Sequence, residues 1–397
     1  MSAAIRIGIC GMGGFAASHH QTVLKLEERN HARLVCTCDP NPNAFLRDQD
    51  AWKFSRRGVR VFSDYREMLA TCRSQLDLLV VPTPIPLHAE MHRAGIQAGL
   101  AVYLEKPPSL DFVELEDMIA LDRTAPKASM VGFNFIIEAT RQTLKQRLLT
   151  GEFGAVKEAR LVGRWPRPTS YFQRNDWAGR LLTPGGRIIL DSCLGNAMAH
   201  FVHNLFFWVG QDELMSWGTP AAVKAELYRA HTIEGADTFF IQTRTREGAE
   251  LRIALSHACM DTQPPLETIH CKKATIRYAI GEEAQVTWLN GRTERHVLEP
   301  FDALSGNHLA YYRYLQGKAD RPPSTLVDSR PLVVMTDLAH VSSGQIVTLS
   351  PPHVRSRVHP QDLKEYFAIE DLSVAQTDFL ESATWPSTRG WSRSAPA

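Results

Sequence analysis

The sequence predicts a two-domain α/β protein, in which a doubly wound parallel sheet is followed by a mostly antiparallel sheet. Three observations indicate this fold class. Short apolar runs alternate with helical patterns over the first 130 residues, and a glycine-rich turn follows the first of these runs. Further along, β-rich segments joined by turn signals fill residues 156–289.

The 397 residues are enough for two or three domains of about 150 residues each. The changes of pattern place one α/β domain over residues 1–128 and a second over 129–349. Residues 350–397 are expected to form an extended tail that wraps the domain or makes a dimer contact, and otherwise stays disordered. The net charge of +1 creates no field that would favour nucleic acid or an anionic membrane surface. Seven cysteines without metal-type spacing, and the lack of a signal-peptide pattern, favour the cytoplasm.

The first predicted strand, residues 5–10, runs into a glycine-rich turn that fits G-x-G-x-x-A, made by Gly11, Met12, Gly13, Gly14, Phe15 and Ala16. Such a turn lets the backbone approach a pyrophosphate, and the helix predicted over 19–28 offers its positive N-terminal end. The next strand, 33–38, ends in Asp39, 23 residues after Ala16, a spacing typical of a carboxylate that binds a ribose 2′-hydroxyl. No basic residue follows before Arg47, which favours NAD over NADP. Alternatively, Asp39 only starts a turn.

The strand and helix units then repeat, with strands over 59–62, 76–81, 102–104 and 130–134 and helices over 65–74, 87–98 and 112–122. The strand 102–104 stops at Glu105-Lys106-Pro107. Because Pro107 cannot continue the ladder, Lys106 is expected just past the carboxyl end of a parallel strand, where ligands bind. A lone Lys-Pro is more often part of a surface loop, and only the preceding repeats favour a ligand site.

These residues resemble the glucose-fructose oxidoreductase / inositol dehydrogenase / rhizopine catabolism (Gfo/Idh/MocA) family. The resemblance runs from residue 5 to about 345. It implies a Rossmann domain, a second domain built on a large, open, mostly antiparallel sheet, a nicotinamide cofactor, and a carbohydrate or polyol substrate. It implies that Lys106 contacts both substrate and nicotinamide ribose, and that the peptide bond before Pro107 is often cis. The cofactor-binding residues it suggests are Gly11, Gly13, Gly14, Phe15, Ala16, Asp39, Thr83, His88, Glu105 and Lys106.

In the second domain a helix over 137–150 precedes strands over 156–163, 222–228, 238–245, 250–256, 274–279 and 285–289, and helices follow over 309–315 and 332–343. Residues 164–177 lack any period and are rich in arginine and aromatic side chains. Aromatic faces with polar neighbours suit a sugar ring, although a long surface loop explains the segment equally well. The resemblance favours substrate contact by Trp165, Tyr171, Arg174 or Trp177.

In the family, a Gly-Gly run leads to an Asp and, four residues later on one helix face, a His; this pair does the acid-base work. Here the pattern departs. Counting from Gly185-Gly186 selects Asp191, whereas counting back from the end of the apolar helix selects Asn196 and His200. We predict His200 as proton acceptor on a helix face shared with Asn196, with Asp191 or Asn196 orienting it or the substrate. A packed core histidine, or a metal site with His203, are the alternatives.

The predicted function is that of an NAD-dependent oxidoreductase acting on a secondary hydroxyl of a sugar, sugar derivative or polyol. His200 would accept the proton and Lys106 would stabilise the developing alkoxide. One alternative keeps NAD tightly bound and uses a transient 3-keto sugar for glycoside cleavage, elimination or epimerisation. Another is a non-catalytic sensor. We expect no resident metal and no nucleic-acid or membrane partner, and a homodimer or homotetramer formed through an exposed sheet face.

Overall fold

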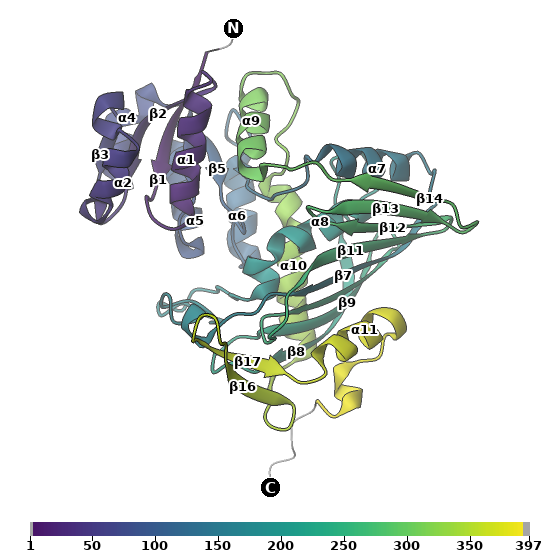
Figure 1. Cartoon of the computed structure of the whole chain (residues 1–397). Helices are drawn as coiled ribbons and strands as arrows, with labels where there is room; N and C mark the ends of the chain where they lie inside the picture. The colour runs from purple at the N-terminus through teal and green to yellow at the C-terminus, as the bar shows by residue number, and fades with distance from the viewer. Residues whose placement is uncertain (1–2, 392–397) are drawn as a thin grey trace. The chain divides into compact units, whose positions relative to one another are not determined.

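The computed structural model describes residues 3–391, which divide into two compact units (Figure 1). Unit 1 consists of the residues up to Ile137 together with a later segment, Phe301–Ser329. Unit 2 comprises Glu138–Pro300 and the residues from Arg330 on. These limits differ from the predicted boundary after residue 128, because a late helix returns to the first unit.

Unit 1 is built on a six-stranded sheet in the order β3-β2-β1-β4-β5-β6, and all its neighbouring strands are parallel. Its strands β4 and β5 are buried apolar runs, as expected for central strands with both faces covered. This confirms the predicted doubly wound domain. The strands are β1 (Ile5–Cys10), β2 (Ala32–Cys38), β3 (Arg60–Phe62), β4 (Leu78–Val81), β5 (Ala101–Leu104) and β6 (Met130–Val131).

The helices between these strands begin where the sequence offers a cap. The Asp64 carboxylate accepts the backbone N–H of Arg66 at the start of α4, and Asp111 accepts that of Val113 at the start of α6. The helices of this part are α1 (Phe15–Glu27), α2 (Leu46–Ala51), α3 (Phe54–Arg57), α4 (Tyr65–Cys72), α5 (His88–Gln97) and α6 (Phe112–Asp122).

Helix α9 (Ala303–Leu315) belongs to unit 1 although it follows the large sheet of unit 2 in sequence. Its Tyr311 and Tyr312 are buried in the same hydrophobic core as Val80 of β4. The Tyr311 hydroxyl also donates to the carbonyl oxygen of Val102 at 3.1 Å. Burial of these two rings explains why the chain returns to the first unit.

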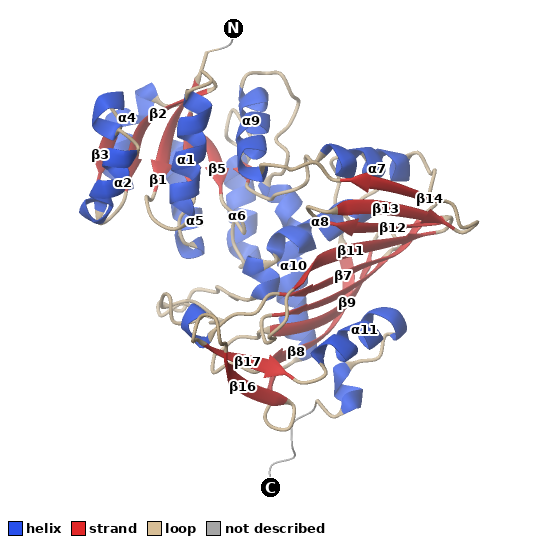
Figure 2. Cartoon of the chain, in the orientation of Figure 1, coloured by secondary structure: helices blue, strands red, loops and turns tan. Residues whose placement is uncertain are grey.

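Unit 2 is built on a nine-stranded sheet in the order β14-β13-β12-β11-β7-β10-β9-β8-β15 (Figure 2). Neighbours are antiparallel except the pairs β7 with β10 and β8 with β15, which confirms a mostly antiparallel sheet. Strands β11, β14 and β15 were not predicted. The strands are β7 (Val156–Arg164), β8 (Pro220–Arg229), β9 (Thr238–Thr245), β10 (Glu250–Ser256), β11 (Gln263–Cys271), β12 (Ala274–Ala279), β13 (Glu283–Trp288), β14 (Thr293–Val297) and β15 (Ile346–Thr348).

Both faces of this sheet carry packed elements, as two neighbouring rings of β9 show. The Phe239 ring lies 5.9 Å from that of His340 in α10 (Leu326–Ser343), while the Phe240 ring lies 5.4 Å from that of Phe379 in α11 (Leu372–Ser382). Successive strand residues point to opposite faces, so α10 and α11 cover opposite sides. Helices α7 (Ala139–Leu149) and α8 (Ala199–Val209) complete the unit.

The predicted extended tail is instead folded as far as the structure describes it. Residues after 350 form a hairpin of β16 (Val354–Val358) and β17 (Glu365–Ile369), then α11 and a short 3₁₀ turn, Pro386–Arg389 (Figure 1, yellow). The physical reason is apolar burial: Phe379, Trp385 and Trp391 share a core with Phe240 of β9. Residues 392–397 of the predicted tail lie outside the described residues.

Helices in the described range 3–391 are either too short or too polar to cross a membrane.

Candidate functional site

The glycine-rich turn has the backbone geometry that a dinucleotide requires. Gly11 has φ of +94° and Gly14 of +55°, both in the region that favours glycine. A Cβ at Gly13 would lie 2.9 Å from the Phe45 ring, and beside Gly14 the space is open. Helix α1 starts at Phe15 without a side-chain cap in the described residues, and the Ala16 and Ala17 N–H groups donate to the Gly13 and Gly14 carbonyls. The positive N-terminal end of the helix still favours an anion. The loop therefore fits a pyrophosphate.

Asp39 lies at the carboxyl end of β2, next to this turn. Its carboxylate accepts the backbone N–H of Met12 and that of Asn41, each at 3.0 Å. These hydrogen bonds orient the half-buried side chain beside the glycine-rich turn. An anionic acceptor here can also bind a ribose hydroxyl, which fits NAD.

The side chain of one histidine forms hydrogen bonds with the segments that follow β4 and β5. The buried His88 ring lies 2.8 Å from the Thr83 carbonyl oxygen through Nε2 and 2.9 Å from that of Pro107 through Nδ1. Glu105 and Lys106 follow β5 directly; the Glu105 N–H donates to the Val81 carbonyl at 3.1 Å. The Lys106–Pro107 peptide bond is cis.

All the predicted cofactor-side residues thus lie at one edge of the unit 1 sheet. Strands β2, β1, β4 and β5 are neighbours in parallel, and Asp39, the glycine-rich turn, Thr83 and Lys106 follow their carboxyl ends. In doubly wound sheets this edge is where ligands bind.

In unit 2, Asp191 and Asn196, the two candidate partners of His200, are hydrogen-bonded to each other. The Asn196 side-chain amide donates to Asp191 Oδ1 at 2.7 Å, and Gly179 N–H donates to Asp191 Oδ2 at 2.8 Å. Arg174 lies 3.5 Å from the same carboxylate, which is 3 % exposed. Asp191 is therefore a buried anchor that fixes the Asn196 side chain.

The prediction that Asn196 and His200 lie on one α-helix is wrong. Residues Cys193–Ala197 form a π-helical turn, and α8 begins only at Ala199, so the two side chains do not share an α-helical face. This wider turn lies between Asp191 and His200, where the two ways of counting in the sequence disagree. His200 lies half-buried in the first turn of α8.

The predicted substrate segment forms a stack of rings and guanidinium groups. The Tyr171 ring contacts the guanidinium carbon of Arg174 at 3.8 Å and that of Arg167 at 4.7 Å, and Arg174 also lies 5.4 Å from the Trp177 ring. Trp165 packs edge-on against Phe201 at 5.6 Å. The Tyr171 and Trp177 rings, both expected to meet a sugar, thus contact guanidinium groups of this chain.

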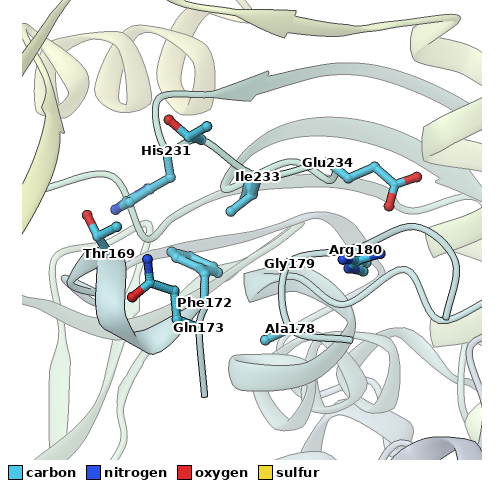
Figure 3. Close-up of a pocket in the computed structure, with 10 residues that line it drawn as sticks. Thr169, Phe172, Gln173, Ala178, Gly179, Arg180, His231, Ile233 and Glu234 are labelled. Carbon is cyan, nitrogen blue, oxygen red and sulfur yellow. The ribbon is translucent and has the colours of Figure 1, made fainter. Parts of the chain in front are cut away.

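Beside this stack is a pocket of about 440 Å³ (Figure 3). Its apolar part comes from Phe172, Ala178 and Ile233. Figure 3 shows Thr169 and Gln173 on one side of these residues and Arg180 and Glu234 on the other. Because Gly179 lines the pocket and bonds to Asp191, the pocket adjoins the Asp191 anchor.

Sequence reasoning missed two buried polar groups. His231, in the pocket wall, hydrogen-bonds Asp237 Oδ2 at 2.8 Å; burial alone would raise the pKa of Asp237, but this bond and backbone N–H groups bring it below its ordinary value. In unit 1, His19 contacts Glu105 and His308. His231 and Asp237 lie in one loop between β8 and β9 without a recognisable motif, whereas His19, Glu105 and His308 lie far apart in the sequence.

Among residues 3–391, no group of three or more His, Cys, Asp or Glu side chains is arranged so that it could hold a metal ion. His92 Nε2 lies 3.2 Å from Asp122 Oδ1, as a single pair.

Comparison with known proteins agrees with the fold of unit 1. Residues 5–133 match the sequence model of the Gfo/Idh/MocA oxidoreductases, described as an oxidoreductase family with an NAD-binding Rossmann fold. Through its first domain, the chain is therefore similar to the Gfo/Idh/MocA family.

The relatives with assigned names are distant. Inositol 2-dehydrogenase of Rhizobium meliloti is 24% identical over 181 residues, 45% of this chain and 52% of the relative. A glycosyl hydrolase family 109 protein of Shewanella amazonensis is 27% identical over 173 residues, 40% of this chain and 36% of the relative. The matched region thus spans about half the length of these relatives or less.

Solved structures extend the likeness in fold beyond the first unit. The WlbA dehydrogenase of Bordetella pertussis, solved in complex with NADH and UDP-GlcNAcA, has a TM-score of 0.69 at 23% identity, over 86% of this chain and 97% of that one. At this identity the likeness concerns the fold alone.

Proposed function

We propose that the protein is an NAD-dependent oxidoreductase that oxidises a secondary hydroxyl of a sugar, sugar derivative or polyol. The observation that carries the proposal is the carboxyl edge of the unit 1 sheet, where an open glycine-rich turn, Asp39 and Lys106 follow neighbouring strands. Inositol 2-dehydrogenase and the WlbA dehydrogenase, which act on or bind hydroxylated rings according to their names, support the substrate class.

NAD, when bound, supplies the hydride acceptor. The proposal gives Lys106 the role of stabilising the negative charge that develops on the substrate oxygen. His200 accepts the hydroxyl proton, because an imidazole titrates near neutral pH. The Asp191–Asn196 pair orients the substrate or the imidazole, and the pocket around Phe172 holds part of the sugar through its mixed apolar and polar lining.

The test is NADH formation, followed at 340 nm, with a panel of polyols, free sugars, glycosides and nucleotide sugars. We expect Lys106→Met to lower kcat about 100- to 1000-fold with the best substrate, as for loss of one stabilising group on a developing oxyanion. Lys157→Met, on an exposed position of β7, is the control. Turnover by Lys106→Met equal to that of the control would refute the role given to Lys106. NADH binding without oxidation of any substrate would favour a sensor.

A second candidate is an enzyme that retains NAD and passes through a transient 3-keto sugar. The observation that favours it is the match to a glycosyl hydrolase family 109 protein. This candidate predicts NAD that survives gel filtration and glycoside cleavage without net NADH. Cleavage by protein stripped of dinucleotide would rule it out.

A further inference from the structure

A chain of three buried hydrogen bonds crosses unit 1 from the end of β5 to α9. Glu105 Oε1 lies 3.0 Å from His19 Nε2, His19 Nδ1 lies 3.0 Å from His308 Nε2, and His308 Nδ1 lies 3.0 Å from the Tyr312 hydroxyl. Both histidines are 0 % exposed, Tyr312 is 2 % exposed and Glu105 is 7 % exposed. The His19–His308 hydrogen bond joins residues 289 positions apart in the sequence.

The direction of these hydrogen bonds follows from their ends. At one end, the Tyr312 hydroxyl has no partner but His308 among the described residues, so it must donate to His308 Nδ1. His308 then carries its proton on Nε2 and donates to His19 Nδ1, and His19 donates through Nε2 to the Glu105 carboxylate. Burial, and then the nearby His19, hold the pKa of His308 well below its ordinary value, which agrees with a neutral ring.

The carboxylate at the other end holds the backbone of the lysine. Glu105 Oε2 accepts the Lys106 N–H at 3.2 Å. His19 also lies on α1, the helix that follows the glycine-rich turn, with its ring 5.4 Å from that of Phe15. The hydrogen-bond chain therefore connects α9 to both elements that flank the proposed cofactor site.

We propose that His308 is a positioning residue for the cofactor site, acting through His19 and Glu105 to fix Lys106 and the start of α1. This inference rests on the proposed function for the role of Lys106, and on the NAD-binding domain for its readout. Without the His308 N–H, His19 Nδ1 becomes a buried acceptor without a donor, and the Glu105 carboxylate loses its orientation.

The experiment compares two substitutions of similar size at His308 in the full chain. His308→Gln keeps an N–H donor at the Nε2 position, whereas His308→Met removes it. We expect the Kd for NADH, measured by fluorescence titration, to rise about tenfold in His308→Met and to stay within about threefold in His308→Gln. His31→Gln, at an exposed position just before β2, is the control.

A spectroscopic measurement distinguishes the proposed hydrogen-bond chain from a general loss of packing at His308. We expect long-range ¹H–¹⁵N NMR spectra of the wild type to show the Nε2–H tautomer for both His19 and His308, and Tyr312→Phe to change the ¹⁵N shifts of both rings. Nδ1–H tautomers in the wild type, or equal NADH binding by folded His308→Gln and His308→Met, would overturn the proposal. A wild-type protein that does not bind NADH would instead overturn the proposed function.

Discussion

At the residue scale, Asp39 serves two purposes that a single substitution separates. It fixes the glycine-rich turn through Met12, and it offers a negative charge where a ribose hydroxyl would bind. We predict that Asp39→Ala raises the Kd for NADH about tenfold or more, because hydrogen bonds to a charged group are lost. The Kd for NADPH should change less, since repulsion of a 2′-phosphate is also relieved.

Fluorescence titration with both dinucleotides measures this difference. Asp48→Ala, at an exposed position of α2, should leave both constants unchanged. Equal weakening of NADH and NADPH would mean that Asp39 only shapes the turn.

Single residues also show where sequence reasoning stops. Lys106 and Asp39 could be found because each follows a recognisable strand and lies at a predictable sheet edge. The bond between Asp191 and Asn196 could not, since it depends on a π-helical turn that leaves no periodic signal. His308 lies on a helix far along the chain, and only the fold brings it to His19.

At the element scale, the strands of unit 1 were predictable because buried parallel strands appear as short apolar runs between helices. Strand β11 was missed because two prolines stand near its start and a buried glutamate, Glu267, interrupts its apolar residues. Glu267 is paired there with the buried Arg141 at 2.6 Å. The C-terminal hairpin and α11 were missed although the sequence carries a short apolar run, 366–369, in β17 and buried apolar residues at helical spacing in α11.

The folded C-terminal segment gives a stability prediction. Phe379 of α11 is fully buried against Phe240 and Trp385, so Phe379→Ala should lower the free energy of unfolding by about 3 kcal/mol or more. Val374→Ala, at an exposed position of the same helix, should change it by less than about 0.5 kcal/mol. Urea unfolding compares the two variants; similar values would mean that α11 does not stabilise the sheet.

At the scale of the whole molecule, buried neutral histidines should make the fold sensitive to acid. Burial lowers the pKa of His20 to about 4, because it outweighs the hydrogen bond to the Gly11 carbonyl, which acts to raise the pKa. Burial likewise lowers the pKa of His257 to about 3. Between pH 6.5 and these values the unfolded chain binds more protons than the folded one, so stability falls as the pH falls.

His20→Gln tests this effect because glutamine can donate to Gly11 but does not titrate. From pH 7 to pH 5 the stability advantage of the wild type over this variant should shrink by about 2 kcal/mol, measured by urea unfolding at both pH values. An unchanged difference would mean that His20 is not a source of the acid sensitivity.

The homodimer or homotetramer expected from an exposed sheet face stays a prediction, as does the cytoplasmic location. The segment after residue 350 covers part of the sheet at β9, through Phe379 against Phe240. Light scattering at micromolar concentration measures the mass directly. A monomer of 44.5 kDa would contradict the oligomer.

The central claim is that unit 1 holds NAD for hydride transfer at its sheet edge. The most direct measurement is absorbance and mass spectrometry of the small molecules released by denaturing the purified protein, followed by titration of the emptied protein with NAD. We predict one NAD or NADH per chain, either retained or bound saturably when added. Absence of any released dinucleotide, together with no saturable binding up to about 1 mM, would contradict the account.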